Sequence, residues 1–217
     1  MKQGIIFDLD GTLMDTSEGV IHSVVYLLEK LGYEIPDNDM LKTFIGPPIK
    51  DRLIDLYNML EDDALQAHML FRKHYAKGDI YMAKAYDGME EVLKKLRNAG
   101  YKLGVATNKR EDHAILLLHR YELDQYFDVI CGTDMEGKHT KSDVIESAIE
   151  RLGVEKKDTV MIGDSDNDAF AAENVGIEFV AVTYGFGFKT EEQIRKYPHI
   201  GVVSNCRQIY NIIYDIH

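Results

Sequence analysis

Apolar and polar positions follow one pattern up to about residue 83 and another from residue 86 onward. In the second part, stretches with apolar residues at i, i+3, i+4 and i+7, such as the one from Met89 to Leu96, alternate with short apolar runs. The i, i+3, i+4, i+7 spacing predicts helices, and the short apolar runs predict buried strands. Asp87 and Glu90 have the spacing of a capping box for the first of these helices. The expected strands are residues 5–7, 102–107, 128–131, 159–163 and 178–183, and the expected helices are 87–100, 110–121, 140–152, 166–175 and 205–216. Such alternation predicts an α/β fold with a doubly wound parallel sheet, in which ligands bind at the carboxyl ends of the strands.

Residues 16–83 are predicted to be almost entirely helical. The expected helices are residues 17–31, 37–44, 49–58 and 61–77. We therefore expect two domains, an α/β domain of residues 1–15 and 84–217 and an inserted all-helical domain of residues 16–83. Inside the helical domain, Gly46-Pro47-Pro48 cannot continue a helix, because proline lacks the amide hydrogen and restricts the residue before it. This rigid loop is either a connector between helices or a surface that faces a substrate.

Composition narrows the classes of partner. The chain has 217 residues, a net charge of −12 and a pI near 5.1, which argues against a nucleic-acid partner, because binding to nucleic acid depends on Lys and Arg. A small phosphorylated metabolite remains compatible with this charge. Cys131 and Cys206 are far apart, and the histidines form no H-E-x-x-H or Cys/His motif, so reduced thiols and no zinc are expected. No apolar run has the length of a membrane span, and a cytoplasmic protein is expected.

The most informative stretch is the one that follows the first strand. Asp8 and Asp10 come directly after the apolar residues 5–7, and Gly11 follows them. Because side chains alternate along an extended chain, both carboxylates face the same side. Such a pair suits phosphoryl transfer, in which one carboxylate attacks phosphorus, the other moves a proton, and Mg²⁺ shares oxygens of both. The alternative is an ordinary surface turn rich in Asp and Gly.

Polar residues also follow other predicted strands. Thr107 and Asn108 end one strand, where they could donate to a phosphate or cap a helix. Asp164 and Asp168 belong to an acidic stretch after residues 159–163, and capping explains one acid there but not three. Lys141 lies in the first turn of a helix that Thr140 is expected to cap together with Asp143. A cation opposes the helix dipole at that place, and a nearby anion would offset this cost.

These motifs together resemble those of the haloacid dehalogenase-like hydrolases, and specifically the phosphoglycolate phosphatase-like branch with a helical cap. The four motifs are Asp8-Leu9-Asp10-Gly11-Thr12, Thr107-Asn108, Lys141 and Gly163-Asp164-x-x-x-Asp168, and they span the chain in the expected order. The resemblance implies a Rossmann-like core with the cap inserted after the first strand, at residues 16–83. It also implies a phosphatase that acts through an aspartyl-phosphate intermediate with Mg²⁺ as cofactor.

The resemblance assigns a role to each motif residue. Asp8 would be the nucleophile, and Asp10 would protonate the leaving alcohol and then activate water. Mg²⁺ would bind Asp8, the Asp10 carbonyl and Asp164, with Asp168 in support. The phosphoryl oxygens would be held by Thr107, Asn108 and Lys141. The cap residues are a separate expectation. Two chain connections join the helical domain to the core, so it could move as a lid, and the rigid loop at Gly46 would then bring Lys50 or Arg52 to the part of the substrate beyond the phosphate. The alternative is that these two cations are simply solvated.

Several alternatives stay open from the sequence. Ser142 stands where the family usually has proline, and this departure, with the Gly46 loop and residues 183–187, is more similar to members that act on 5′-nucleotides. Phosphoglycolate, a nucleoside monophosphate, a sugar phosphate and pyrophosphate are all possible substrates, and a phosphosugar mutase would use the same aspartates. Residues 132–138 imitate a phosphate-binding P-loop, but His139 replaces the required Ser or Thr. A receiver module and an inactive binding protein are disfavoured by Asp10 and by the complete motif set. The oligomeric state is not predicted.

Overall fold

A computed structural model describes residues 2–134 and 138–215 of the chain. They divide into two compact units: Met1–Asp15 with Ala85–His217, called the core unit below, and Thr16–Lys84, called the helical unit. Two short strands, β2 (Met14–Asp15) and β3 (Lys84–Ala85), pair with each other at the points where the chain leaves the core unit and returns to it. In the part of the chain that the structure describes, every helix is too short or too polar to cross a membrane.

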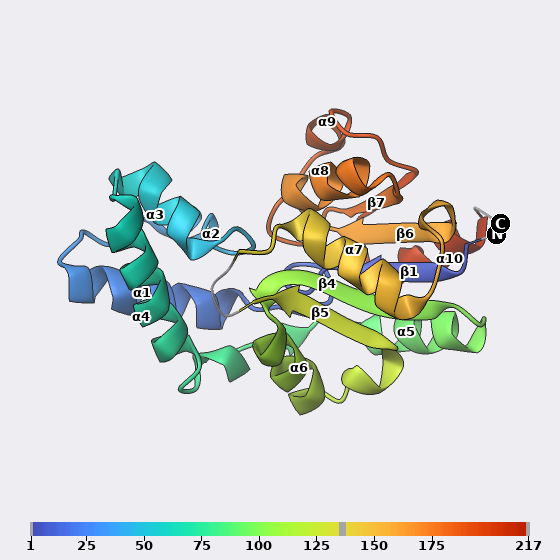
Figure 1. The fold of residues 1–217 in the computed structure, drawn as a ribbon, viewed down its shortest axis with the longest axis horizontal. Coiled ribbons are helices and arrows are strands. Elements are labelled where there is room, and N and C mark those ends of the chain that lie inside the picture. Colours follow the sequence, from blue (N-terminus) through green and yellow to red (C-terminus); the bar gives the residue numbers. More distant parts are fainter. Residues whose placement is uncertain (1, 135–137, 216–217) are drawn as a thin grey trace. The chain divides into compact units, whose positions relative to one another are not determined.

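The core unit is built on a parallel sheet of six strands in the order β5-β4-β1-β6-β7-β8 (Figure 1). The strands are β1 (Gly4–Phe7), β4 (Lys102–Arg110), β5 (Val129–Thr133), β6 (Thr159–Gly163), β7 (Glu178–Val182) and β8 (Gly201–Val203). All residues of β1 and β6 are buried, as expected for parallel strands covered on both faces. The predicted α/β class with a doubly wound parallel sheet is confirmed.

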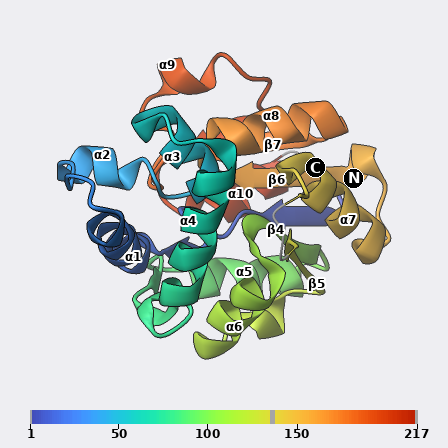
Figure 2. The ribbon, with the colours of Figure 1, turned by 60° about the vertical axis from the view of Figure 1, so that its left-hand side comes forward.

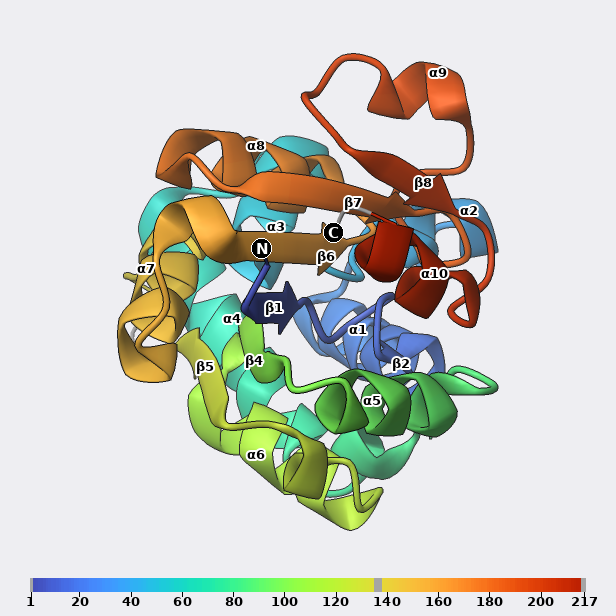
Figure 3. The same cartoon turned by 90° about the vertical axis from the view of Figure 1, so that its right-hand side faces the viewer.

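Helices cover both faces of this sheet (Figure 3). One face carries α7 (Lys141–Leu152) and α8 (Asp166–Val175), and the other carries α5 (Met89–Asn98), α6 (Glu111–Arg120) and α10 (Gln208–Asp215). Under α7 and α8, the apolar residues Ile145, Ala148 and Ala172 pack with Ile6 and Met161 of the sheet. A short helix, α9 (Glu191–Ile194), and the 3-10 turns η2 (Asp124–Tyr126) and η3 (Lys156–Asp158) complete the unit.

The strand order places the candidate motifs beside one another. β1 lies between β4 and β6, with Phe7 opposite Val105 on one side and Ile162 on the other. The residues that follow these three strands therefore emerge together at the carboxyl edge of the sheet. In a doubly wound fold, this is the place where the direction of strand order reverses and where ligands bind.

The helical unit contains α1 (Ser17–Leu31), α2 (Asn38–Lys42), α3 (Ile49–Tyr57), α4 (Glu61–Tyr75) and the 3-10 turn η1 (Asp79–Tyr81) (Figure 2). α4 packs against both α1 and α3, and η1 packs against α1 and α4. The bounds of α1 agree with the sequence prediction because Gly32 ends the helix in the left-handed conformation, with φ 75°. Buried Val24, Leu27 and Leu28 form the inner face of α1.

Several local predictions need correction. The expected capping box of Asp87 and Glu90 is wrong, because Gly88 in the left-handed conformation is the N-cap of α5 and no side chain caps it. β4 runs to Arg110 rather than to Thr107, and its pairing with β5 shifts register between those two residues. β8 was not predicted, because its three residues are too few to show a period. The stretch that imitates a P-loop includes residues 135–137, which lie outside the described residues.

Candidate active site

The first acidic pair lies at the end of β1, in a tight turn. Asp8 and Asp10 are almost fully buried, with exposed fractions of 5% and 8%. Gly11 follows with φ +90°, and a Cβ at this position would lie 2.3 Å from Oδ2 of Asp164. Any side chain here would therefore push the Asp164 carboxylate out of place. The glycine brings the β1 turn and the β6 turn into contact, which excludes the alternative of a plain surface turn at Asp8 and Asp10.

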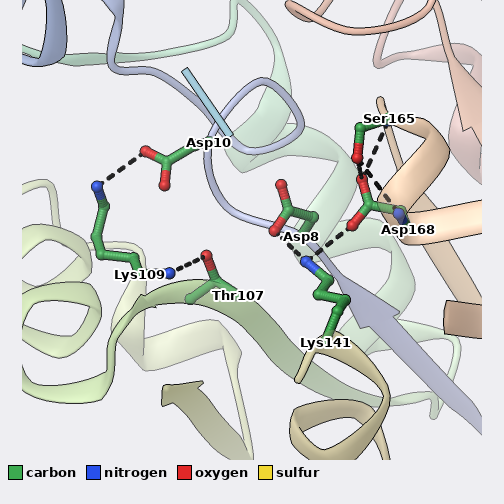
Figure 4. Close-up of polar contacts among 7 residues, drawn as sticks. All are labelled: Asp8, Asp10, Thr107, Lys109, Lys141, Ser165 and Asp168. Carbon is green, nitrogen blue, oxygen red and sulfur yellow. Dashed lines mark hydrogen bonds and ion pairs between the residues drawn. The ribbon is translucent and has the colours of Figure 1, made fainter. Parts of the chain in front are cut away.

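Lys141 joins two of the carboxylates (Figure 4). Its Nζ lies 2.5 Å from Oδ1 of Asp8 and 2.8 Å from Oδ1 of Asp168, and the lysine is 4% exposed. The predicted capping box at the start of α7 is confirmed: Thr140 accepts from the amide of Asp143, and the Asp143 carboxylate accepts from Thr140. This cap fixes the first turn of α7, so that Lys141 extends toward the carboxyl edge of the sheet. The anions expected near this lysine are Asp8 and Asp168.

Asp168 has a second structural task. Its Oδ2 accepts hydrogen bonds from the amide and the hydroxyl of Ser165, at 3.1 and 2.6 Å. Ser165 in turn accepts from the amide of Asp168, so the two residues form the capping box of α8. One oxygen of the carboxylate thus holds the helix start, while the other pairs with Lys141.

Asp164 is held by a segment that follows β7. Its Oδ2 accepts hydrogen bonds from the backbone amides of Phe186, at 2.6 Å, and Gly187, at 3.0 Å. The carbonyl of Asp164 also accepts from the amide of Phe188. A Cβ on Gly185 would lie 2.3 Å from the Gly11 carbonyl oxygen and 2.4 Å from Asp164 Oδ2. In the sequence, this glycine-rich segment was connected only with substrate type, whereas the structure shows that it positions an acid.

Lys109 is a site residue that the sequence analysis missed. Its Nζ lies 3.0 Å from Oδ1 of Asp10, and its side chain is only 8% exposed (Figure 4). The amide of Lys109 donates to Oγ1 of Thr107 at 3.2 Å, so a local hydrogen bond links the lysine to the threonine, which is 1% exposed. The register shift in β4 lies at this point. Asn108 stands between them, half-buried.

Charges are unbalanced in this site. Among the described residues, four carboxylates, those of Asp8, Asp10, Asp164 and Asp168, face two ammonium groups. Burial raises the pKa of the Asp164 carboxyl to about 7, and the neighbouring Asp168 carboxylate adds to the effect. Burial likewise raises the pKa of Asp8 well above its ordinary value, although Lys141 opposes this. Burial alone would lower the pKa of Lys141, but the carboxylates of Asp168 and Asp8 outweigh it and hold this pKa above its usual range.

The excess of two negative charges fits a divalent cation. Oxygen atoms of Asp8, Asp164 and Asp168 lie within 4.8 Å of one another, close enough to share one ion. A set of carboxylate oxygens without nitrogen or sulfur suits a hard cation. A bound cation would also lower the raised pKa values of Asp8 and Asp164, because it favours the ionised form.

The residues predicted for the site separate into two groups. Asp8, Asp10, Lys141, Asp164, Asp168 and the Thr107-Asn108 pair all belong to the carboxyl edge of the core unit. Gly46, Lys50 and Arg52 belong to the helical unit, where Gly46 has φ +99°. There, Lys50 pairs with Glu61 at 3.2 Å, and Arg52 donates to Oγ1 of Thr43 at 2.7 Å.

Comparisons with known proteins agree with this geometry. The family model described as haloacid dehalogenase-like hydrolase matches residues 5–182. A 5′-nucleotidase of Pseudomonas aeruginosa is 34% identical over 90% of this chain and 89% of its own length. The crystal structure of a predicted phosphatase from Clostridium acetobutylicum superimposes with a TM-score of 0.94 at 34% identity, covering 99% of both chains.

Other relatives carry different names. The tyrosine-protein kinase PtkA of Mycobacterium tuberculosis is 34% identical over 85% of this chain, which spans 63% of that protein. Pyrophosphatase PpaX of Halalkalibacterium halodurans is 29% identical over 96% of this chain and 95% of its own length. A phosphoglycolate phosphatase of Aquifex aeolicus is 30% identical over 84% of this chain and 85% of its own length. The family match covers all four motifs and the whole parallel sheet up to β7, and the chain is therefore an enzyme of the haloacid dehalogenase-like hydrolase family.

Proposed function

We propose that this enzyme is a Mg²⁺-dependent phosphatase that hydrolyses small phosphomonoesters, in the manner of a phosphoglycolate phosphatase, through an aspartyl-phosphate intermediate on Asp8. Phosphatase activity, the coarser part of this statement, is confirmed by the family and by relatives named as phosphatases. The metal, the intermediate, the residue roles and the substrate are the proposed part.

The observation that carries the proposal is the environment of Asp8. A buried carboxylate at a strand end, paired with the buried ammonium of Lys141 at 2.5 Å, is held in one position without the mobility of a surface side chain. Pre-positioning of a nucleophile supplies much of the rate of phosphoryl transfer, because the bimolecular step becomes effectively intramolecular. In the first step a carboxylate oxygen of Asp8 bonds to phosphorus while the bond from phosphorus to the leaving oxygen breaks.

Asp10 is proposed to move the protons. It gives a proton to the leaving alcohol in the first step and removes one from the water that cleaves the Asp8 phosphoryl bond in the second. Lys109, 3.0 Å from Asp10 Oδ1, fixes the direction in which this carboxyl points. Thr107, Asn108 and Lys141 are proposed to donate to the phosphoryl oxygens, where their dipoles and charge stabilise the transition state.

Mg²⁺ is the proposed cofactor, because the nearby ligand atoms of the three aspartates are all carboxylate oxygens. Asp8, Asp164 and Asp168 offer the oxygen atoms, and the carbonyl of Asp10 is proposed as a further ligand. When bound, the ion neutralises charge that develops on the phosphoryl oxygens. The amides of Phe186 and Gly187 donate to Oδ2 of Asp164 and so favour the ionised form that would bind the metal, against the effect of burial.

The helical unit is proposed to act as a cap whose residues Gly46, Lys50 and Arg52 contact the substrate beyond its phosphate. Two features of this unit support a further anionic or polar group in the substrate. Nε of Arg52 is buried and makes no hydrogen bond within the described residues. His68 lies near Lys50 and Arg72, and burial together with these two cations lowers its pKa to about 4. A carboxylate, as in phosphoglycolate, or a second phosphoryl group would suit Arg52 Nε or the cations Lys50 and Arg72 beside His68.

The test is a comparison of Asp8→Asn with Asp166→Asn, an exposed acid at the start of α8. Phosphate release is measured with Mg²⁺ over a panel that includes phosphoglycolate, nucleoside monophosphates, sugar phosphates and pyrophosphate. Asp8→Asn should lose activity by a factor of roughly 10³ or more on every substrate, with an unchanged circular dichroism spectrum, whereas Asp166→Asn should resemble the wild type. Rapid acid quenching should trap protein-bound phosphate in the wild type and in Asp166→Asn but not in Asp8→Asn. Substantial phosphate release by Asp8→Asn would disprove the mechanism, and release of an isomeric sugar phosphate instead of inorganic phosphate would indicate a mutase.

A further inference from the structure

Two histidines and an aspartate converge inside the helical unit, and no part of the proposed reaction uses them. His22 lies on α1, His74 in the last turn of α4, and Asp79 in the 3-10 turn η1. The ligand atoms of the three lie within 4.8 Å of one another. His22 and Asp79 are 57 residues apart, which explains why sequence spacing predicted no zinc.

The three side chains meet at one oxygen atom. Oδ2 of Asp79 lies 2.9 Å from Nδ1 of His22 and 3.4 Å from Nε2 of His74, and it accepts a hydrogen bond from the Ser23 hydroxyl at 2.5 Å. The contacts with His22 and with Ser23 are short, and together they use the two usual acceptor directions of the Asp79 oxygen. The contact to His74 is longer than an ordinary hydrogen bond of 2.7–3.2 Å. Hydrogen bonding alone therefore leaves His74 poorly accounted for.

The longer distance suits two ligands on one metal ion. A tetrahedral ion with bonds of about 2.0–2.1 Å to nitrogen and oxygen places its ligand atoms about 3.3–3.4 Å apart. The His74 to Asp79 distance already has this value. The His22 to Asp79 distance is shorter by a few tenths of an ångström, and the His22 side chain is 59% exposed, so it can move outward to reach it.

The two inner ligands are held in place by their neighbours. The ring of His74 stacks on Tyr26, with the ring centroids 3.6 Å apart and the planes inclined by 9°. Asp79 is 9% exposed and is bonded to fully buried Ser23. Its backbone is pressed against α1, because a Cβ on Gly19 would lie 2.0 Å from the Asp79 carbonyl oxygen. Outer partners of this kind orient metal ligands and raise affinity by about 10–100-fold.

We propose that His22 Nδ1, His74 Nε2 and Asp79 Oδ2 bind a transition-metal dication of the zinc type, with the fourth position open to water on the His22 side. Two imidazole nitrogens and one carboxylate favour Zn²⁺, Co²⁺ or Ni²⁺ over Mg²⁺, which prefers oxygen. The ion would link α1, α4 and η1, and would thereby fix η1, near the C-terminal end of the helical unit, to α1, its first helix. This inference does not depend on the proposed phosphatase mechanism.

The experiment uses the full chain with Co²⁺ as a spectroscopic probe, in excess Mg²⁺ so that the carboxylates of the core unit are already occupied. The wild type should develop the visible absorption of tetrahedral Co²⁺, which Zn²⁺ should displace at one equivalent. Cys131 and Cys206 are buried, so thiolate ligation does not compete. His22→Gln, a change at an exposed side chain, should weaken Co²⁺ binding by about tenfold or more, and His74→Gln should do the same.

His119→Gln is the matched control. His119 lies 2.8 Å from Asp124, and among the described residues it belongs to no group of potential metal ligands. Its loss should leave Co²⁺ affinity unchanged. Zn²⁺ should also raise the thermal midpoint of the wild type and of His119→Gln but not that of His22→Gln. Absence of tetrahedral Co²⁺ absorption in the wild type, or equal affinity in the wild type and His22→Gln, would overturn the proposal.

Discussion

Nζ of Lys109 lies 3.0 Å from Oδ1 of Asp10, and both side chains are nearly buried. We predict that Lys109→Met lowers kcat by roughly 10 to 100-fold, because the carboxyl that is proposed to transfer protons is no longer held in one direction. KM for a small phosphoester should change much less. Steady-state kinetics with Lys138→Met, at an exposed lysine in the loop before α7, provides the control. Equal kcat values in the two variants would show that Lys109 does not position Asp10.

Lys141 should matter for both rate and stability. Lys141→Ala removes the ammonium that pairs with Asp8 and Asp168, and we expect kcat/KM to fall by about 10²–10³. Because it leaves buried carboxylates without their partner, the free energy of unfolding should fall by about 3–5 kcal/mol. Chemical denaturation and kinetics measure the two effects separately. Lys138→Ala should be mild in both, and the reverse order would require a different assignment of the lysine motif.

The raised pKa of Asp164 predicts a specific dependence of stability on pH. This carboxyl has a pKa of about 7 when folded and an ordinary value of 3.8 when unfolded, so between these values the folded state holds a proton that the unfolded state has lost. Its contribution to stability is complete below pH 3.8 and is lost as the pH rises to about 7. Without divalent ions, the free energy of unfolding should fall over this window.

Mg²⁺ should reverse this loss, because only the ionised Asp164 binds the cation. The apparent affinity for Mg²⁺ should therefore increase as the pH rises through about 7, and thermal midpoints with and without Mg²⁺ should diverge above that pH. Asp164→Asn should remove most of the divergence. A Mg²⁺-induced stabilisation that is the same at pH 5 and pH 8 would argue against Asp164 as a ligand.

Gly185 allows the segment after β7 to approach Asp164. Gly185→Ala would place Cβ 2.3 Å from the Gly11 carbonyl oxygen, and we expect a loss of about 1–3 kcal/mol in stability together with weaker Mg²⁺ binding. Calorimetric titration with Mg²⁺ measures the second effect. In the control, Gly201→Ala, the nearest atom is the end of the flexible Ile212 side chain, and Mg²⁺ affinity should be unchanged.

Lys50 and Arg52 are expected to set substrate preference. Lys50→Ala or Arg52→Ala should raise KM for phosphoglycolate or other substrates with a second anionic group, by about tenfold for one lost charged contact, while leaving turnover of a small generic phosphoester almost unchanged. Lys42→Ala, at an exposed lysine of the same unit, is the control. If both variants keep the wild-type order of substrates, the two cations are structural, through their contacts with Glu61 and Thr43.

Helices and strands with strong local signals at their ends were predicted well from the sequence. The bounds of α1, β6 and α8 agree with the predictions because each ends at a glycine or begins at a capping side chain. Asp87 and Glu90 had the right spacing for a capping box, but Gly88 in the left-handed conformation is the N-cap, and α5 begins at Met89. A sequence pattern records the side chains available for capping, whereas the backbone conformation decides which residue becomes the cap.

The site was predictable where its residues form a motif and not where tertiary contacts define it. Asp8, Asp164 and Lys141 follow strands or a cap, so their convergence could be inferred from the parallel sheet. Lys109 has the appearance of a solvated lysine, and its burial depends on a register shift that no local pattern reveals. The amides of Phe186 and Gly187 reach Asp164 from more than twenty residues away, and backbone donors leave no trace in residue identity.

The two oxygens of Asp168 belong to different systems: Oδ1 pairs with Lys141, and Oδ2 caps α8 through Ser165. A substitution at this position changes the reactive centre and the helix start at once, so an inactive Asp168 variant could not distinguish lost chemistry from local unfolding. Asp8 carries no such cap and can be studied on its own. A displacement of the α8 start would therefore also displace the carboxyl group that pairs with Lys141, so the position of the reactive centre depends on an intact helix cap.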